Sequence, residues 1–142
     1  MNKIYSDIGR LIMTYDKHFK AFMKKELASS GLNVAEAMVM MALYEKDGQT
    51  QDQLLHELSY DKSVMTRVIQ SLEAAGMIYR TQNTEDGRSW IMNLTPEGIS
   101  VKRKILSALR KWCTIAFEGI DDESAAQLLS VLMTVRDNIK DT

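Results

Sequence analysis

A run of polar side chains in the middle of the chain has the spacing of one helical face. From Asp61 to Gly76, apolar and polar residues alternate in steps of three and four, as in an amphipathic helix. Gly76 supplies the left-handed stop that ends many helices. Hydroxyl, amide, guanidinium and ammonium groups on such a face can donate hydrogen bonds to phosphates and to base edges in a major groove. The polar positions are Lys62, Ser63, Thr66, Arg67 and Gln70.

A β-hairpin with a charged turn is predicted directly after this helix. Residues 77–81 and 89–94 have the pattern of strands, and Asn83–Gly87 has the composition of a turn. Arg88 follows at the tip, where a guanidinium group could enter a narrow minor groove with its enhanced negative potential. Asp86 would repel phosphate, so its expected role in the site is to orient Arg88 or to pair with a nearby arginine. A helix that fits the major groove, followed by such a hairpin, indicates a winged helix-turn-helix.

Five further helices are predicted around this helix and hairpin. The first has a broad apolar stripe, and the second is apolar nearly all round, so we expect it to be enclosed. The third begins with a capping box at Thr50–Gln53, and the fourth begins with Thr95 as cap and Pro96 at its first position. The predicted fold class is mainly α with a small β-hairpin wing. The five helices cover residues 3–28, 34–46, 51–58, about 96–120 and about 122–139.

Composition indicates an ordinary globular protein. The chain has 142 residues, 45% hydrophobic and 26% charged, which suits a single domain with a sizeable core. No apolar run approaches the roughly 18 residues that a membrane span requires. Residues 1–19 mix acids with bases and lack the cleavage pattern of a signal peptide. We therefore expect a cytoplasmic protein that does not contact a membrane.

The charge balance is unfavourable for binding nucleic acid, because many such proteins have a basic footprint. The chain carries a net charge of −1, and residues 51–95 hold four bases and six acids, a balance of 4 − 6 = −2. Affinity for DNA would then depend on where the few bases lie and on their doubling in a dimer. Lys62 and Arg80 are the weaker candidates, because bases at helix starts and on strands are usually solvated.

Nothing in the sequence indicates catalysis or a bound metal ion. It shows no paired carboxylates, no nucleophile with a neighbouring base and no glycine-rich phosphate loop. His18 and His56 are too far apart to indicate a chelate, and Cys113, the single cysteine, is expected to pack as an inert thiol. The ten methionines are expected to fill the core. We predict that the protein is not an enzyme and uses no metal and no other cofactor.

Three segments together resemble the multiple-antibiotic-resistance regulator (MarR) family of bacterial transcription factors. They are DKSVMTRVIQSLEAAGMIYR at residues 61–80, DGRS at 86–89 and MNLTPEG at 92–98. The LT-x-x-G start of the penultimate helix and the aspartate-x-arginine of the turn are the most diagnostic features. Gly87 departs from the family pattern, in which a second arginine is common at this position, so the wing is less basic.

The resemblance extends over nearly the whole chain, treated as one MarR-like domain of residues 1–142, and it implies how that domain is organised. A winged helix-turn-helix would occupy residues 33–95, and a helical dimerisation region would comprise residues 1–30 and 96–142. The implied protein is a homodimer that binds double-stranded DNA at a pseudo-palindromic operator, and we expect it to be a repressor.

Related proteins accept small aromatic ligands, so the resemblance also implies an effector pocket between the dimerisation helices and the winged region. Helical positions that could line it, but would serve equally well as core, are Tyr15, His18, Phe22, Met41 and Tyr44. A small aromatic or phenolic effector is the expected ligand.

Two functions from different classes remain open at the level of sequence. One is a DNA-binding regulator whose affinity a small molecule modulates. The other is a non-catalytic winged-helix module that contacts proteins instead of DNA, which the acidic balance of residues 51–95 would suit. The polar helical face and Arg88 are the features that distinguish the two.

Overall fold

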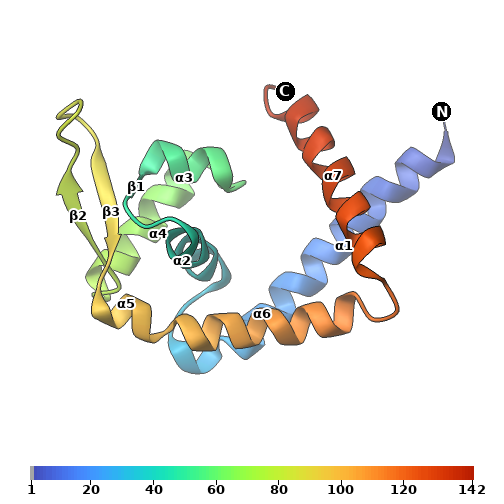
Figure 1. Ribbon diagram of the computed structural model, residues 1–142, viewed down its shortest axis with the longest axis horizontal. Coiled ribbons are helices and arrows are strands. Elements are labelled where there is room, and N and C mark those ends of the chain that lie inside the picture. The colour runs from blue at the N-terminus through green and yellow to red at the C-terminus, as the bar shows by residue number, and fades with distance from the viewer. Residues whose placement is uncertain (1) are drawn as a thin grey trace. The chain divides into compact units, whose positions relative to one another are not determined.

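The structure is a computed structural model that describes residues 2–142. Helices make up most of the chain, and the middle of the chain also forms one small β-sheet (Figure 1). The chain divides into two compact units, residues 1–109 and residues 110–142. In chain order the elements are α1 (Lys3–Glu26), the 3-10 turn η1 (Ala28–Ser30), α2 (Val34–Glu45), β1 (Gln49–Thr50), α3 (Gln51–Glu57), α4 (Lys62–Ala74), β2 (Ile78–Gln82), β3 (Trp90–Leu94), α5 (Pro96–Ser100), α6 (Lys102–Ala116) and α7 (Asp122–Ile139).

The predicted helix starts are formed largely by the capping residues that the sequence supplies. Thr50 and Gln53 make the expected reciprocal capping box at α3, and Asn33 makes another with Glu36 at α2. Asp61 occupies the N-cap position of α4, but its side chain makes no capping hydrogen bond. The start of α4 therefore depends on backbone geometry and packing rather than on an aspartate cap.

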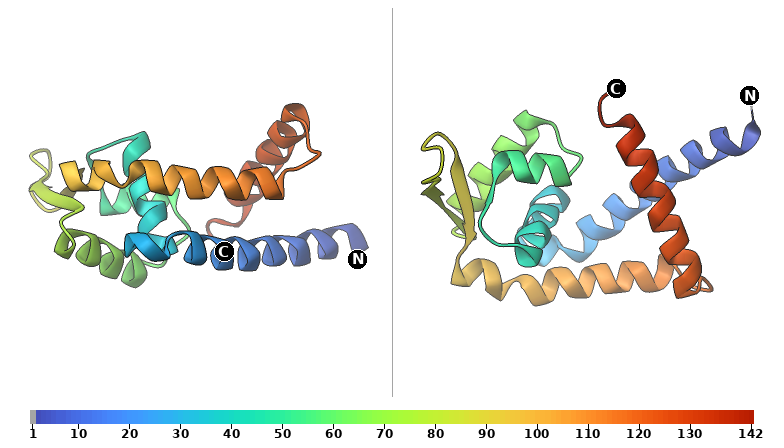
Figure 2. Two further views of the ribbon diagram at one scale, coloured as in Figure 1. Left: turned by 90° about the horizontal axis from the view of Figure 1, so that it is seen from below. Right: turned by 45° about the horizontal axis from the view of Figure 1, so that its top comes forward.

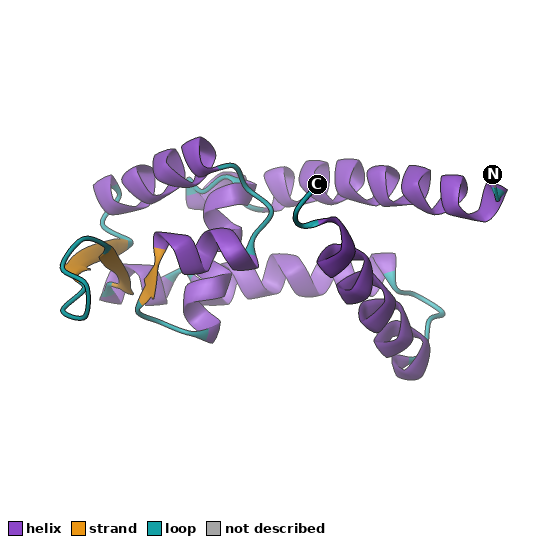
Figure 3. Cartoon of the chain, turned by 90° about the horizontal axis from the view of Figure 1, so that it is seen from above, coloured by secondary structure: helices purple, strands orange, loops and turns teal. Residues whose placement is uncertain are grey.

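The sheet has three antiparallel strands in the order β1-β3-β2. Figure 3 draws the strands in orange among the purple helices. The β2–β3 hairpin is the predicted wing, with Arg80 opposite Met92 and Gln82 opposite Trp90. The third strand, β1, was not predicted from the sequence. It has only two residues, and it exists because the chain between α2 and α3 runs beside Ile91 and Met92 of β3.

The core of the first unit forms around α2, which is enclosed as its all-round apolar sequence predicts. The C-terminal half of α1 lies beside α2, and α3 and α4 also contact it (Figure 2). Met40, Leu43, Leu54 and Met65 are among the fully buried side chains. One buried carboxylate adds a polar tie, because Glu36 of α2 accepts a 3.0 Å hydrogen bond from the hydroxyl of Ser71 on α4. This contact and the apolar core together fix α4 on the surface of the unit.

The segment that begins with Thr95 joins the end of β3, at the base of the hairpin, to the turn after α4. The Thr95 hydroxyl donates to the carbonyl oxygen of Gly76 and accepts from the amide of Gly98, and the Thr95 amide donates to Met77. A Cβ on Gly98 would lie 2.1 Å from the carbonyl oxygen of Met77, so only glycine fits here. Beyond α5 the predicted single helix is interrupted at Val101, and α6 starts at the next residue.

The second unit contains the end of α6, a turn and α7. The turn uses Gly119 at a φ of 78°, and Asp121 caps α7 by accepting a 2.7 Å hydrogen bond from the amide of Ser124. No residue of α7 is buried. Cys113 is exposed in the single chain, next to the buried Trp112, so the predicted packing of its thiol is not found within one chain. Among residues 2–142, no helix combines the length and the apolar character needed to cross a membrane.

Candidate nucleic-acid interface

Helix α4 has one buried and one exposed side, as its sequence predicts. Met65, Val68, Ile69 and Leu72 are buried against the core. The opposite side is a polar surface on an otherwise well-packed helix, with the shape and chemistry that a major groove accepts. The predicted contact residues Lys62, Ser63, Arg67 and Gln70 are all exposed there.

Thr66 differs from its neighbours because its hydroxyl is already hydrogen-bonded within the protein. Its oxygen donates to the carbonyl oxygen of Lys62 at 2.9 Å and accepts from the amide nitrogen of Gln51 at 2.9 Å. The hydroxyl has one hydrogen, so it retains only acceptor capacity for a ligand. Gln51 thereby ties the start of α3 to α4, a contact that sequence reasoning missed because the capping box explained that segment without it.

The turn of the hairpin is organised by Asp86. Its carboxylate accepts hydrogen bonds from the backbone amides of Arg88 at 2.9 Å and Ser89 at 3.1 Å, and from the Ser89 hydroxyl. These bonds, the one from the Arg88 amide first, lower the pKa of Asp86 below its usual value. Asp86 therefore orients the backbone at Arg88, and no ion pair of its carboxylate with an arginine is found among residues 2–142. The guanidinium group of Arg88 lies on an exposed residue.

A hollow of about 280 Å³ lies between α3, α4 and the hairpin. It brings together four of the seven predicted DNA-contact residues, Lys62, Thr66, Gln70 and Arg88, from two separate elements. Ser63 and Arg67 lie elsewhere on α4, and Asp86 lies in the turn. Arg80, a weaker candidate from the sequence, also lines the hollow. The other lining residues were not predicted: Gln51, Asp52, Ile69, Ser89, Trp90 and Met92.

The local charge of this hollow differs from that of the segment as a whole. Its charged lining residues are Lys62, Arg80 and Arg88 against Asp52, a balance of 3 − 1 = +2. Residues 51–95 together carry −2. The acids of the segment therefore lie mostly away from the hollow, and the bases are concentrated where the helix and the wing face each other. Such a surface favours a polyanion.

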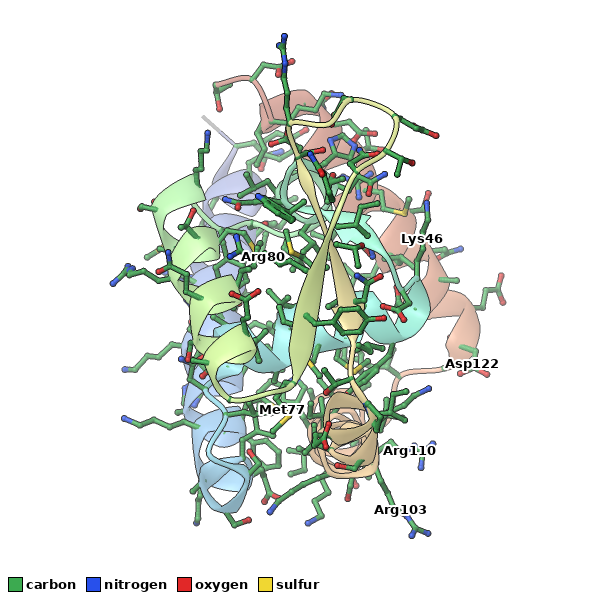
Figure 4. All side chains as sticks on the ribbon, turned by 90° about the vertical axis from the view of Figure 1, so that its left-hand side faces the viewer. Lys46, Met77, Arg80, Arg103, Arg110 and Asp122 are labelled. Carbon is green, nitrogen blue, oxygen red and sulfur yellow. The ribbon has the colours of Figure 1, made fainter. Side chains whose placement is uncertain are left out.

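Arg80 connects α4, the predicted recognition helix of the winged helix-turn-helix, to the wing. Its Nε donates to Glu73 in the last turn of α4 at 2.7 Å, and its guanidinium carbon lies 5.2 Å from the ring centre of Trp90 on β3. Figure 4 labels Arg80 between α4 and the hairpin, with Met77 at the turn between them. From the sequence it was a weaker candidate, because a base on an exposed strand is usually solvated. The spacing of Glu73 and Arg80 across a turn carries little signal by itself.

The five residues predicted to line an effector pocket lie on two helices of the first unit, three on α1 and two on α2. Tyr15 is exposed and stacks on Phe19 with ring centres 6.0 Å apart, and His18 is also exposed. Phe22, Met41 and Tyr44 are half-buried and pack against the core. None of the five lines the hollow between α4 and the wing.

Tyr44 has a structural task in this chain. Its hydroxyl donates a 2.6 Å hydrogen bond to the carbonyl oxygen of Gly98, and the ammonium group of Lys102 lies 5.4 Å from its ring centre. Burial raises the pKa of Tyr44 to about 12, because the ionised phenolate would lose its hydration. Across the described residues 2–142, no three His, Cys, Asp or Glu side chains gather where they could hold a metal ion.

Comparison with known proteins identifies a family that this sequence matches. The sequence profile of the MarR family matches residues 32–90. The uncharacterized HTH-type transcriptional regulator YkoM of Bacillus subtilis (strain 168) is 30% identical over 127 residues, which cover 86% of this chain and 81% of that protein.

Solved structures agree with this comparison. A MarR transcriptional regulator from Methanosarcina mazei Go1 superposes with a TM-score of 0.84 at 25% identity, over 96% of this chain and 99% of the other. CouR from Rhodococcus jostii RHA1, solved with p-coumaroyl-CoA bound, has a TM-score of 0.82 at 25% identity, over 91% of each chain. The chain belongs to the MarR family of DNA-binding, winged-helix transcriptional regulators, which are not enzymes.

Proposed function

We propose that this regulator is a homodimeric repressor that binds a pseudo-palindromic operator and is released from it by a small aromatic or phenolic effector. The observation that carries the DNA-binding part is the basic hollow between α4 and the wing. Lys62, Gln70 and Arg88 reach it from two elements that a winged helix-turn-helix places in adjacent grooves. We propose that the regulator acts in the cytoplasm, because its proposed target is an operator on chromosomal DNA.

In the proposed complex the two elements contact DNA in different ways. Helix α4 lies in the major groove, where Arg67 donates paired hydrogen bonds to a guanine and Ser63 and Gln70 contact neighbouring base edges or phosphates. Lys62 contacts a phosphate at the start of the helix. Arg88 enters the minor groove, held there by the turn that Asp86 organises. Thr66 contributes as an acceptor, and it positions α4 through Gln51.

The proposed dimer follows from apolar surface that one chain leaves exposed. Ile4 and Leu11 on α1 are each 62% exposed, and Leu129 on α7 is 61% exposed. Large exposed apolar patches are rare on monomers and mark interfaces. We propose an isologous interface from residues near 4–15 and 112–139, with 1–30 and 96–142 as dimerisation region and 33–95 as the DNA-binding region of one MarR-like domain. Two recognition helices would then lie roughly 34 Å apart, one turn of DNA.

The effector is the part of the proposal that depends most on a relative. CouR, which resembles this chain over 91% of its length, was solved with a phenolic acyl-CoA. By analogy we propose a small aromatic or phenolic ligand, with Tyr15, His18, Phe22, Met41 and Tyr44 near its site in the dimer. A thermal-shift series with phenolic acids tests this. A raised melting temperature together with weakened operator binding supports it, and unchanged melting across the series contradicts it.

The decisive experiment for the function is an electrophoretic mobility shift with the DNA upstream of the protein's own gene. At low salt and without effector, we expect a discrete complex that competitor DNA of scrambled sequence does not displace. Adding a phenolic ligand that binds should reduce the complex. If no shift occurs across that region, the winged-helix interaction module without DNA binding becomes the better description of this chain.

A further inference from the structure

Arg80 occupies a position that the proposed DNA contacts do not use. It lies on β2, yet its side chain contacts the end of the recognition helix through Glu73 and the wing through Trp90. We propose that Arg80 is a positioning residue that fixes the wing at the distance from α4 required for Arg88 to enter the minor groove. This inference rests on the proposed function of Arg88.

The sheet register explains how one side chain can reach both neighbours. Arg80 is opposite Met92 and Trp90 is opposite Gln82, so Arg80 and Trp90 are diagonal neighbours across two antiparallel strands. Side chains in this relation lie on the same face and within reach when they are long or aromatic. The guanidinium group stacks near the indole ring while its Nε remains free to donate to Glu73. A lysine could not make both contacts with the same planar group.

The outer half of the hairpin has few other ties to the recognition helix. Trp90, at the tip end of β3, is 47% exposed, so its ring is not packed in the core. The hydrogen bonds of the turn join hairpin atoms to one another: the Gln82 amide donates to Gly87, and the Asn83 amide donates to the Ser89 hydroxyl. The hollow of about 280 Å³ separates the outer hairpin from α3 and α4. The contacts of Arg80 span this separation at its inner end.

In the proposed complex, the space between α4 and the wing must hold one strand of the DNA. An element in the major groove and an element in the adjacent minor groove must stand on either side of a sugar-phosphate strand. The hollow between α4 and the wing is where that strand would pass, next to Lys62, Gln70 and Arg88. A hairpin that tilts toward or away from α4 would place Arg88 outside the minor groove even though the recognition helix is unchanged.

The experiment is a double-mutant cycle on operator binding that combines Arg80→Gln with Arg88→Ala. Arg80→Gln alone should weaken operator binding about threefold to tenfold, in keeping with the modest strength of an exposed ion pair and a cation–π contact. It should also flatten sequence preference at the flanking positions that the wing reads, and leave preference at the positions read by α4 unchanged. If Arg80 acts through Arg88, the double variant should bind like Arg88→Ala alone.

Conservative variants separate positioning from general stability. Trp90→Phe retains an aromatic face and should bind within about twofold of the parent protein, whereas Trp90→Ala should resemble Arg80→Gln. Arg103→Gln, on an exposed arginine of α6, is the matched control for loss of one positive charge. Melting temperatures of all variants, measured by circular dichroism, show whether binding was assayed on folded protein.

Each result decides between distinct explanations. Additive losses in the double variant would mean that Arg80 contacts DNA itself, and the positioning role would be wrong. A lower melting temperature with unchanged operator affinity and unchanged flank preference would assign Arg80 to fold stability alone. If Arg88→Ala by itself has no effect on binding, the proposed wing contact fails, and the positioning role fails with it. If Arg88→Ala binds the operator as tightly as the parent protein does, the proposed function stands with α4 alone as the DNA contact.

Discussion

Three arginines of the winged region differ in the contacts that they make within the protein. The guanidinium group of Arg80 contacts Glu73 and Trp90. Arg67 is exposed, and its guanidinium group has no hydrogen bond or ion pair among residues 2–142. Arg88 is exposed, and its backbone rather than its guanidinium group is fixed by Asp86. A side chain with all its donors unused is available for paired hydrogen bonds to a base. The structure therefore separates arginines that sequence reasoning could rank only by their position in a motif.

Arg67 and Arg88 should respond differently to removal. Arg67→Ala should weaken operator binding by about 1–3 kcal/mol per half-site and flatten the sequence preference of that half-site, because a base-reading contact is lost. Arg88→Ala should weaken binding to operator and scrambled DNA more evenly and make the salt dependence shallower. Asp86→Ala should resemble a weaker Arg88→Ala. Binding isotherms on both DNAs at several salt concentrations measure these effects, and an unchanged salt slope for Arg88→Ala would contradict the wing contact.

Tyr44 gives the protein a predictable response to alkaline pH. Its pKa is raised to about 12 in the folded chain against an ordinary value of 10.0, because burial disfavours the phenolate. Its stabilising contribution is complete below about pH 10 and should be lost as the pH rises toward 12, since the unfolded chain ionises first. Urea unfolding across this range measures the decline, and Tyr44→Phe should reduce it. Tyr60→Phe should also reduce it, because burial raises the pKa of Tyr60 as well. Tyr79→Phe, at an exposed tyrosine of β2, is the matched control. A decline that Tyr44→Phe leaves unchanged would assign the effect to other groups.

At the scale of elements, the sequence predicted what periodicity and capping residues encode locally. The three helices of the winged region, α2, α3 and α4, and the hairpin lie where the apolar spacing and the capping box at Thr50 place them. Strand β1 was missed because two residues carry no alternation, and its pairing depends on where β3 lies. The ion pair of Arg80 with Glu73 was missed because it depends on how β2 packs against α4. Contacts between elements arise from tertiary packing, which a local pattern does not contain.

The LT-x-x-G segment shows how a short motif acts across elements. Gly98→Ala would place a Cβ 2.1 Å from the Met77 carbonyl oxygen and 3.2 Å from the Met40 side chain. Backbone cannot yield as a flexible side chain can, so we expect a loss of about 3 kcal/mol, the upper end of the usual cost of overpacking. Denaturant unfolding measures it. Glu97→Ala, exposed in the same helix, is the control and should change stability by about 1 kcal/mol or less. Equal effects of the two variants would show that the close approach is not limiting.

At the scale of the whole molecule, net charge is a poor guide to the partner of this protein. The chain carries −1 overall, yet its bases surround the hollow between α4 and the wing with a local balance of +2. A small number of bases gives weak attraction to DNA of any sequence, because non-specific binding scales with the number of phosphates neutralised. Two copies of the site in a dimer would double that number. Specific binding by this regulator should therefore require the dimer.

The dimer can be tested through the apolar surface of α1. Ile8 and Leu11 are 46% and 62% exposed in the single chain, one helical turn apart. Burying a glutamate at either position in an apolar interface is costly without a partner. Ile8→Glu and Leu11→Glu should therefore convert a species of twice 16.2 kDa into a monomer and abolish tight operator binding. The measurement is sedimentation equilibrium at micromolar concentration.

A matched variant separates loss of the interface from the added charge. Tyr79→Glu introduces the same charge at a side chain of β2 that is 49% exposed, outside the proposed interface, and should leave the sedimenting mass unchanged. Circular dichroism should show the helical content of the α1 variants retained, because α1 contributes its buried residue, Met23, from its C-terminal half. A parent protein that sediments as a 16.2 kDa monomer would contradict the dimer outright. If the α1 variants remain dimeric, the interface must lie elsewhere, and residues near 112–139 become the next to substitute.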